Sequence, residues 1–314
     1  MKFVFGPVPS RRLGQSLGID PVPSKTCNWN CVYCQLGRTV PLSNRRMEYF
    51  PKEQIFNEIE AALARFHRGD IDWITFVGSG ETTLYNQLGW LIEKTREITE
   101  IPVAVITNGS LLYLPEVRQE LLHAHAVLPT FDAGSAELFK HINRPHPEST
   151  FERLLDGLVA FRQEFDGKLW VEVMLLKDMN DTQQSLTEIA NCLQKVHPDR
   201  IHINLPVRPP AEKWVRIPSR DSIDLAKKIL GKIAKVVQPA IGEFVLDDSL
   251  DLENAILNII TRHPMRQKDI EGILHKVASQ NIKDILDKLL ADGKAKVVVR
   301  NGIRYWCTGS STFS

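Results

Sequence analysis

The stretch Cys27-Asn-Trp-Asn-Cys31-Val-Tyr-Cys34 holds three of the five cysteines of the chain. Three thiolates at the spacing C-x3-C-x2-C can converge on one centre, and such soft ligands select zinc or an iron–sulfur cluster. A structural zinc ion normally takes four protein ligands, yet the next histidine is His67 and the next cysteine is Cys192. The stretch therefore predicts an iron–sulfur cluster with one iron open to chemistry, and zinc remains the alternative.

Around this stretch, the composition is that of an ordinary globular protein. The length of 314 residues suggests about two domains. Hydrophobic and charged fractions of 43% and 25% exclude collagen-like, disordered and disulfide-scaffold classes, and the net charge of +1 gives no overall signal for polyanion binding. The sequence has no signal-peptide pattern and no apolar run of about 20 residues. We therefore expect a cytoplasmic protein without a membrane span, in a reducing compartment where clustered cysteines favour metal binding.

Short apolar runs alternate with amphipathic stretches through most of the chain. The apolar runs predict strands over 17–20, 71–77, 102–107, 125–131, 169–176 and 201–205. Apolar residues at helical spacing predict helices over 51–66, 87–98, 149–165, 181–196 and 221–236. Strand–helix alternation of this kind predicts a parallel α/β architecture, although periodicity alone does not separate a barrel from an open sheet.

The last part of the chain has a different pattern. Helices are expected over 251–261, 264–274 and 280–290, followed by two strand-like runs around Asn301-Gly302, a strong hairpin signal. Three helices and a hairpin predict a small winged-helix domain, so we expect one domain over 1–248 and a second over 249–314. The third helix carries Asp284 and Asp287, which phosphate would repel. This favours a packing or partner-docking module over a DNA reader, with RNA contact by the basic hairpin as the alternative.

The cysteine spacing, with Tyr33 as the aromatic residue before the last cysteine, resembles the radical S-adenosylmethionine (SAM) superfamily. The resemblance implies a partial (β/α)6 barrel and a [4Fe–4S] cluster held by Cys27, Cys31 and Cys34, with SAM on the fourth iron. It also implies an oxygen-sensitive enzyme that takes an electron from a flavodoxin- or ferredoxin-type donor. Such an enzyme cleaves SAM to a 5′-deoxyadenosyl radical, which abstracts hydrogen from a substrate.

Polar residues after the expected strands extend the resemblance. Gly78, Ser79, Gly80 and Glu81 resemble the motif that binds the SAM amino group, because glycines permit close backbone approach and a carboxylate accepts from an ammonium. A simple glycine turn is the alternative. The remaining candidate SAM contacts are Tyr33 near the adenine, Thr107 and Asn108 after the third strand, Asp132 after the fourth and Lys177 after the fifth. The alternatives are a strand-ending turn for Thr107-Asn108, a helix cap for Asp132 and a substrate contact for Lys177.

Two further segments, GPVPSRRLGQSLGID (6–20) and INRPH (142–146), resemble radical SAM proteins related to the tRNA wyosine (imidazoguanine) synthases. Those synthases carry an additional cysteine-bound cluster near the N-terminus, whereas this chain has no cysteine before Cys27. The two remaining cysteines, Cys192 and Cys307, are far apart and are expected to be structural. The resemblance therefore supports this sub-group without implying wyosine synthesis.

Charge is concentrated at the front of the chain. Residues 1–50 hold seven Lys and Arg against Asp20 and Glu48, a net charge of +5. These cations either tune the cluster or attract an anionic substrate, such as a tRNA base. An enzyme that modifies or activates a protein is an alternative within the class. The alternative outside the enzyme class is a non-catalytic metal-binding protein with a nucleic-acid-binding or regulatory role.

Overall fold

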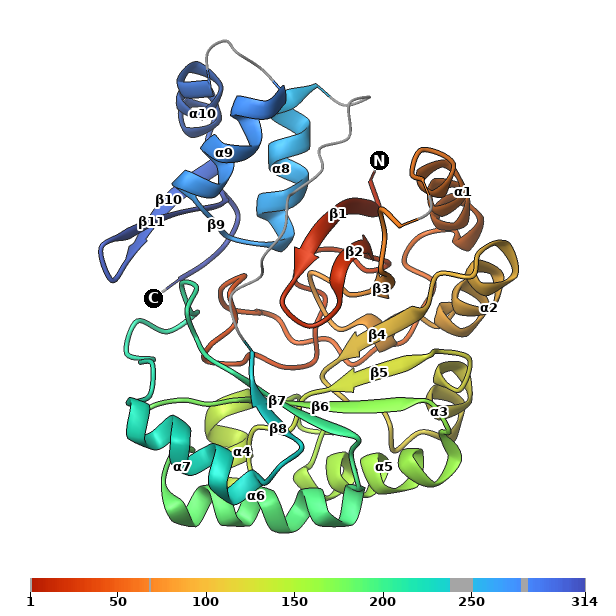
Figure 1. The fold of residues 1–314 in the computed structure, drawn as a ribbon, viewed down its shortest axis with the longest axis vertical. Helices are drawn as coiled ribbons and strands as arrows, with labels where there is room; N and C mark the ends of the chain where they lie inside the picture. The colour runs from red at the N-terminus through yellow and green to blue at the C-terminus, as the bar shows by residue number, and fades with distance from the viewer. Residues whose placement is uncertain (1, 68, 238–250, 278–281, 314) are drawn as a thin grey trace.

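The computed structural model describes residues 2–67, 69–237, 251–277 and 282–313. Figure 1 shows a curved sheet with helices on its outside, and a smaller group of helices and strands packed near the first strands. None of the described helices is long and apolar enough to cross a bilayer.

One eight-stranded sheet forms the main body, and its spatial order follows the chain order from β1 to β8. β1 (Val4–Ser10) runs antiparallel to β2 (Gly14–Ile19), and every later pair is parallel. The later strands are β3 (Trp73–Phe76), β4 (Val103–Thr107), β5 (Ala126–Pro129), β6 (Lys168–Met174), β7 (Arg200–Asn204) and β8 (Ala234–Val236). The C-terminal ends of the parallel strands therefore share one rim.

Helices cover the outer face of this sheet and connect its strands (Figure 1). They are α1 (Lys52–Leu63), the short 3-10 helix η1 (Thr82–Leu84), α2 (Leu88–Ile98), α3 (Pro115–Leu121), α4 (Ala136–Asn143), α5 (Phe151–Glu164), α6 (Gln183–Val196) and α7 (Arg220–Leu230). Four of them begin at a hydroxyl side chain that accepts from a first-turn N–H group: Ser135, Thr150, Thr182 and Ser219. The main apolar core lies between these helices and the sheet.

The inner face of the sheet carries a smaller apolar cluster, formed by Leu13, Ala104, Ala126, Leu128 and Trp170. Leu13 belongs to the turn between β1 and β2, so this turn folds over the inner face. Beside it, Arg12 pairs with Glu172 of β6 at 2.8 Å. The turn reaches β6 because the sheet curls, and a curled parallel sheet with outer helices is a partial β/α barrel.

The six predicted strands are confirmed as β2 to β7. β1 and β8 are additional strands at the two edges, and the short helices α3 and α4 are additional helices. The predicted helix over 221–236 is wrong at its end, because α7 stops at Leu230 and residues 234–236 form β8. Gly231 adopts φ +85°, which breaks the helix. Ile233 suggested a longer apolar face, but its side chain is exposed.

The C-terminal part contains α8 (Leu252–Arg262), β9 (Met265–Arg266), α9 (Gln267–Val277), α10 (Ile282–Ala291), β10 (Ala295–Arg300) and β11 (Ile303–Thr308). Its strands form a separate sheet in the order β10-β11-β9. The predicted hairpin is confirmed, since Arg300 pairs with Ile303 across Asn301-Gly302. The winged-helix interpretation stays a prediction, and the predicted boundary at 248/249 lies outside the described residues.

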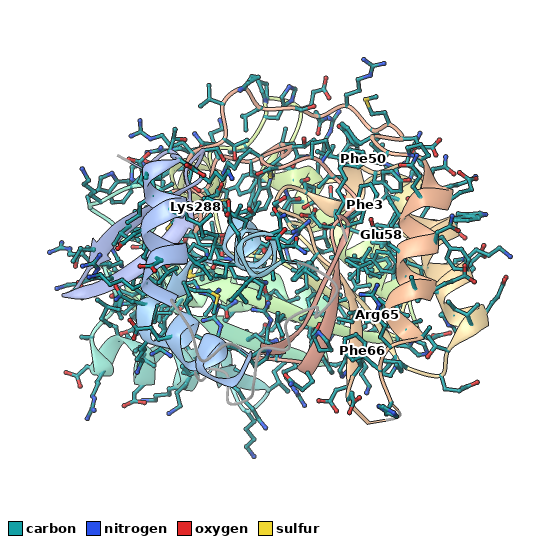
Figure 2. All side chains as sticks on the ribbon, turned by 90° about the horizontal axis from the view of Figure 1, so that it is seen from above. Phe3, Phe50, Glu58, Arg65, Phe66 and Lys288 are labelled. Atoms are coloured by element: carbon teal, nitrogen blue, oxygen red, sulfur yellow. The ribbon has the colours of Figure 1, made fainter. Side chains whose placement is uncertain are left out.

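The N-terminal strand is fixed to the first helix. The carboxylate of Glu58 on α1 accepts hydrogen bonds from the backbone N–H groups of Lys2 and Phe3, at 2.9 and 2.8 Å. The rings of Phe3 and Phe50 lie 4.9 Å apart, and Figure 2 shows both close to Glu58. These contacts hold β1 at the edge of the sheet, where it forms one side of the cavity described next.

Candidate active site

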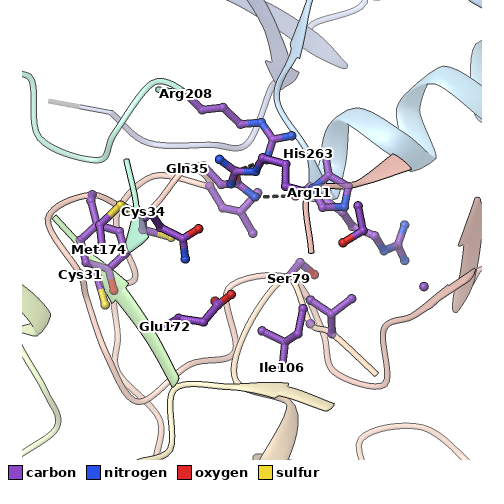
Figure 3. Close-up of a pocket in the computed structure, with 18 of the residues that line it drawn as sticks. Arg11, Cys31, Cys34, Gln35, Ser79, Ile106, Glu172, Met174, Arg208 and His263 are labelled. Atoms are coloured by element: carbon purple, nitrogen blue, oxygen red, sulfur yellow. Dashed lines mark hydrogen bonds between the residues drawn. The ribbon is translucent and has the colours of Figure 1, made fainter. Parts of the chain in front are cut away.

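A cavity of about 320 Å³ lies between the inner face of the sheet and the segment that joins α8 to β9. Figure 3 shows side chains from both ends of the chain gathered around it. Seven of the predicted site residues line this cavity: Cys27, Cys31, Tyr33, Cys34, Gly78, Ser79 and Gly80. The predicted residues outside its lining are Glu81, Thr107, Asn108, Asp132 and Lys177.

The three clustered cysteines are free thiols, and each receives an N–H group. The backbone N–H of Trp29 lies 3.4 Å from the Cys27 sulfur. The amide of Asn143 lies 3.6 Å from the Cys31 sulfur, and the ammonium of Lys25 lies 3.7 Å from that of Cys34. N–H groups aimed at sulfur suit thiolates and tune the potential of a bound cluster. This donor set therefore fits a group that binds all three sulfurs.

The cysteines are not arranged around one ion. Within residues 2–67, 69–237, 251–277 and 282–313, no three His, Cys, Asp or Glu side chains are placed to hold a single metal ion. A zinc ion would draw its sulfur ligands to about 2.3 Å from itself. Burial raises the pKa of Cys27 to about 12 and also raises the pKa of Cys31. Burial therefore favours the protonated form of both thiols in the protein alone.

The cysteine loop is held by the segment that follows α4. The N–H groups of Asn30 and Val32 donate to the carbonyls of Asn143 and Ile142, at 3.0 and 2.9 Å. A further bridge joins Trp29 to Pro145. The segment INRPH, which the sequence singled out, thus supports the loop from below the cysteines.

Asp132 is the buried centre of this support. Its carboxylate accepts from the Tyr33 hydroxyl at 2.5 Å, the Asn143 amide at 2.8 Å and the Met174 N–H at 2.7 Å. Burial raises the pKa of Asp132 to about 6, although these hydrogen bonds oppose the shift. Because its partners belong to the protein, the structure places Asp132 beneath the cysteine loop, and its predicted contact with SAM stays a prediction.

The glycine-containing loop after β3 is paired with the cysteine loop. Lys25 N–H donates to the Ser79 carbonyl, and Glu81 N–H donates to the Thr26 carbonyl, both at 2.8 Å. A Cβ at position 80 would overlap the carbonyl oxygen of Thr26, so only glycine permits this approach. The two loops consequently present their residues to the cavity as one unit.

Glu81 connects the same unit to β4. Its carboxylate accepts from the hydroxyls of Thr83 and Thr107, each at 2.5 Å, and from the N–H of Asn108 at 2.7 Å. Burial raises the pKa of Glu81, while these hydrogen bonds favour its charged form. Asn108 in turn extends its amide toward the Cys27 sulfur, at 3.9 Å. Thr107, Asn108 and Glu81 thus lie together behind the cavity wall, whereas the side chain of Lys177 is exposed. The contacts with SAM predicted for these four residues stay predictions.

Asp20, at the end of β2, joins this loop to the C-terminal part. It accepts from the Ser79 hydroxyl at 2.7 Å and pairs with Arg262 of α8 at 2.9 Å. Burial raises the pKa of Asp20, and the cation of Arg262 opposes that shift. Arg262 and His263 both line the cavity, so the C-terminal part closes one of its sides.

The sequence analysis did not single out Glu172, Arg208, Arg262 or His263. The spacing between these residues carries no periodic signal, and the fold brings them to the cavity from β6, from the loop after β7 and from the end of α8. Arg262 and His263 had been expected only as part of a separate domain.

Comparison with known proteins identifies the class. Residues 22–205 match the radical SAM superfamily, which is more than half of the chain. The chain belongs to this superfamily and is an enzyme of the radical SAM class, which removes the non-catalytic alternative. Its relatives include UPF0026 proteins. One from Methanocaldococcus jannaschii is 36% identical over 94% of this chain and 92% of its own length. One from Helicobacter pylori strain J99 is 31% identical over 91% and 92%.

A third relative is longer. This chain is 38% identical to the GTPase Obg of Brachyspira hyodysenteriae over 96% of its own length, but it spans 44% of that protein. Among solved structures, native anSMEcpe with bound AdoMet and a Kp18Cys peptide matches with a TM-score of 0.50 at 16% identity, over 68% of this chain and 58% of that one. TYW1 with a lysine-pyruvate adduct matches with a TM-score of 0.47 at 12% identity, over 95% and 81%. The match to anSMEcpe supports the fold alone, and the match to TYW1 is too weak to support a conclusion.

Proposed function

We propose that this radical SAM enzyme holds a [4Fe–4S] cluster through Cys27, Cys31 and Cys34, and binds SAM against the loop of Gly78 to Gly80. The observation that carries the proposal is the pairing of these two loops on one cavity wall, with an N–H group on each sulfur. Three cysteines leave one iron of such a cluster for a ligand that is not protein.

The chain has defined tasks in this arrangement. The carbonyls of Gly78 and Gly80 accept no hydrogen bond from another described residue, so they are available to the ammonium group of SAM. Tyr33 lines the cavity with its hydroxyl turned to Asp132. Burial raises the pKa of Tyr33 well above its usual value, so its ring stays neutral and offers an apolar edge to an adenine. When bound, the cluster and SAM supply a 5′-deoxyadenosyl radical that abstracts hydrogen from the substrate.

The finer assignments extend this proposal. We propose an RNA base or another anionic molecule as the substrate, with a protein substrate as the alternative. A low-potential flavodoxin- or ferredoxin-type protein would supply the electron. Membership of the wyosine-synthase-like sub-group, and a winged-helix fold for the C-terminal part, stay predictions of the sequence. A cavity lined by several arginines supports the anionic substrate.

SAM cleavage tests the proposal directly. The chain is reconstituted anaerobically with iron and sulfide, reduced with dithionite and incubated with SAM. We expect about four iron atoms per chain in the iron and sulfide assay. We also expect 5′-deoxyadenosine in the product analysis. A chain that carries the full cluster and binds SAM but releases no 5′-deoxyadenosine under reduction contradicts the proposal.

A further inference from the structure

Five cationic side chains line the cavity, and they come from separate parts of the chain: Arg11, Arg12, Lys25, Arg208 and Arg262. Glu172 carries the only carboxylate among the described lining residues, and Arg12 already pairs with it at 2.8 Å. Arg262 pairs with Asp20. The ammonium of Lys25 lies 2.5 Å from the Gly37 carbonyl, on the cysteine loop. Three of the five cations therefore have partners in the fold.

The other two, Arg11 and Arg208, have no acidic partner. Arg11 makes no hydrogen bond or ion pair with any residue that the structure describes, and Arg208 donates to the neutral side chain of Gln35 at 2.7 Å. The nearby carboxylate of Asp269 pairs with Arg266 instead, at 2.7 Å. Figure 3 shows Arg11, Arg208 and His263 on the same side of the cavity. Two guanidinium groups thus face this space without a carboxylate in direct contact, although Glu172 acts on Arg11 and Asp269 on Arg208 from farther away.

Keeping these cations close together has an electrostatic cost. Burial, and then the charge of Arg12, lowers the pKa of Arg11 to about 10, although the Glu172 carboxylate opposes the shift. Burial, and then the charges of Arg11 and Arg12, lowers the pKa of Arg208 to about 9. Both values lie above neutrality, so both side chains remain charged. A buried charge without a partner is costly, and a ligand of opposite charge removes that cost.

Two further polar atoms at the cavity lack partners. The buried Nδ1 of His263 and the buried Oδ1 of Asn204 have no hydrogen-bond partner among the described residues. Burial and the surrounding arginines, Arg208 first, lower the pKa of His263 well below its usual value, so its ring is neutral. These atoms indicate that the cavity is built for a polar ligand, beyond the two cations.

We propose that Arg11 and Arg208 bind an oxyanion of the substrate, a phosphate or a carboxylate, on the side of the cavity that His263 and the C-terminal part close. This inference rests on the proposed function, because it names the substrate class of the same site. Guanidinium groups match the oxygens of phosphate and carboxylate by paired hydrogen bonds. SAM is a poor counter-ion here, since its ammonium and sulfonium groups outweigh its single carboxylate.

The test uses the full chain, reconstituted with its cluster, and two probes: inorganic phosphate and acetate at equal ionic strength. The variants are Arg11→Gln and Arg208→Gln, with Arg208→Lys to keep the charge. Arg220→Gln is the matched control, because Arg220 is exposed at the start of α7. Three quantities are measured for each variant: the shift of the unfolding midpoint with each probe, the affinity for SAM, and the amount of 5′-deoxyadenosine formed without substrate.

We expect at least one probe to stabilise the parent chain and the Arg220→Gln control equally. Loss of either guanidinium group should weaken the affinity for that probe about tenfold or more. The variant Arg208→Lys should retain part of this affinity. The probe that binds identifies the oxyanion. Arg11→Gln should also raise the unfolding midpoint without probe, because it removes an unpaired charge. That gain does not depend on activity, and it shows that the variant folds.

Two results overturn the inference. One is a probe effect that is absent in the parent chain or the same in all variants. The other is a tenfold loss of SAM affinity in Arg11→Gln or Arg208→Gln, which would assign these cations to SAM. If the probes fail while 5′-deoxyadenosine still forms, the proposed function stands without the oxyanion site. If 5′-deoxyadenosine is absent while the probes bind as expected, the proposed function fails and the anion site remains.

Discussion

At the level of single residues, the clustered cysteines differ from the other two in what surrounds them. Cys27, Cys31 and Cys34 line a cavity and receive N–H groups. Cys192 packs in the core on α6, and Cys307 is buried in β11. Only the first three can reach a shared ligand.

Replacing Cys31 by Ala should therefore abolish the cluster. Cys192→Ala is the matched control: it removes a buried thiol and should cost about 1 kcal/mol of stability, with its iron retained. Iron and sulfide are measured after anaerobic reconstitution, together with the visible absorption of the cluster. Equal iron in Cys31→Ala and in the control would sink the ligand assignment.

His202 on β7 gives a prediction about pH. It is the register partner of Glu172 on the neighbouring strand β6, and its ring lies 5.7 Å from that of Trp170. Burial, then Arg12 and Arg200, lowers its pKa to about 3. The unfolded chain, with a histidine pKa of about 6.5, binds a proton that the folded chain excludes. This residue therefore reduces stability as the pH falls from about 6.5 toward 3, by up to about 1.4 kcal/mol per pH unit.

The variant His202→Phe keeps the ring and removes the titration. Its free energy of unfolding relative to the parent chain should improve steadily between pH 7 and pH 5, as measured by urea unfolding. The other titrating groups are shared by both proteins and cancel in the difference. Parallel stability curves over this range would show that His202 is not buried in neutral form.

At the level of elements, the site is a set of loops joined to one another at the rim of the sheet. The loop after β2 is hydrogen-bonded to the loop after β3, and Glu81 ties the latter to the end of β4. Each connection is a hydrogen bond made by a buried polar group. Their positions are therefore coupled, and a change in one loop is transmitted to the cysteines.

Glu81→Gln tests this coupling. An amide would turn a donor toward the N–H and hydroxyl groups that Glu81 now accepts from, so we expect a loss of about 2–3 kcal/mol in the free energy of unfolding. SAM affinity should fall as well. Glu97→Gln, which alters an exposed pair with Lys94, should have little effect on either quantity. Similar losses in both variants would contradict the role of Glu81.

The elements that were predicted correctly are those with a local signal. The apolar runs of β2 to β7 and the Asn301-Gly302 turn each determine their structure within a few residues. β1 was missed because its glycine and prolines do not resemble an ordinary strand. The end of the helix predicted over 221–236 was wrong, because the exposed Ile233 fitted the apolar spacing although residues 234–236 form β8. The three clustered cysteines could be singled out because they are neighbours in sequence, whereas the arginines of the cavity meet through the fold alone.

At the level of the whole molecule, the C-terminal part is attached to the active-site side of the barrel. Arg300 of β10 donates to the Pro206 and Val215 carbonyls, and the Tyr305 hydroxyl donates to the Val207 carbonyl at 3.0 Å. These contacts hold the loop that carries Arg208. The packing or partner-docking role that the sequence favoured for this part stays a prediction.

The pair of Asp20 with Arg262 supports a prediction at this scale. Arg262→Leu leaves a buried carboxylate alone and should cost about 3–5 kcal/mol at pH 8. Burial already raises the pKa of Asp20, and loss of Arg262 raises it further. In the variant, Asp20 therefore gains a proton as the pH falls. The loss in its free energy of unfolding, relative to the parent chain, should be smaller at pH 5.5 than at pH 8.

Urea unfolding at pH 8 and pH 5.5 measures both deficits. Arg266→Leu is the control, because Arg266 forms a more exposed pair with Asp269 and should cost about 0–1 kcal/mol. The double variant with Asp20→Asn should recover part of the loss at pH 8. A deficit that does not change with pH would mean that the pair is not what holds the two parts together.

The contacts that join the two ends of the chain have a consequence for how the protein matures. Asp20 and Arg262 are 242 positions apart, and Arg38 and Thr312 are 274 apart. Contacts of such long range form after local structure, because the intervening chain must first be ordered. During synthesis, the cysteine loop is complete long before the segments that cover it exist. Under the proposed function, this interval gives an iron–sulfur carrier open access to the thiols. Docking of the C-terminal part, which places Arg262 and His263 in the cavity lining, then covers one side of the assembled cofactor.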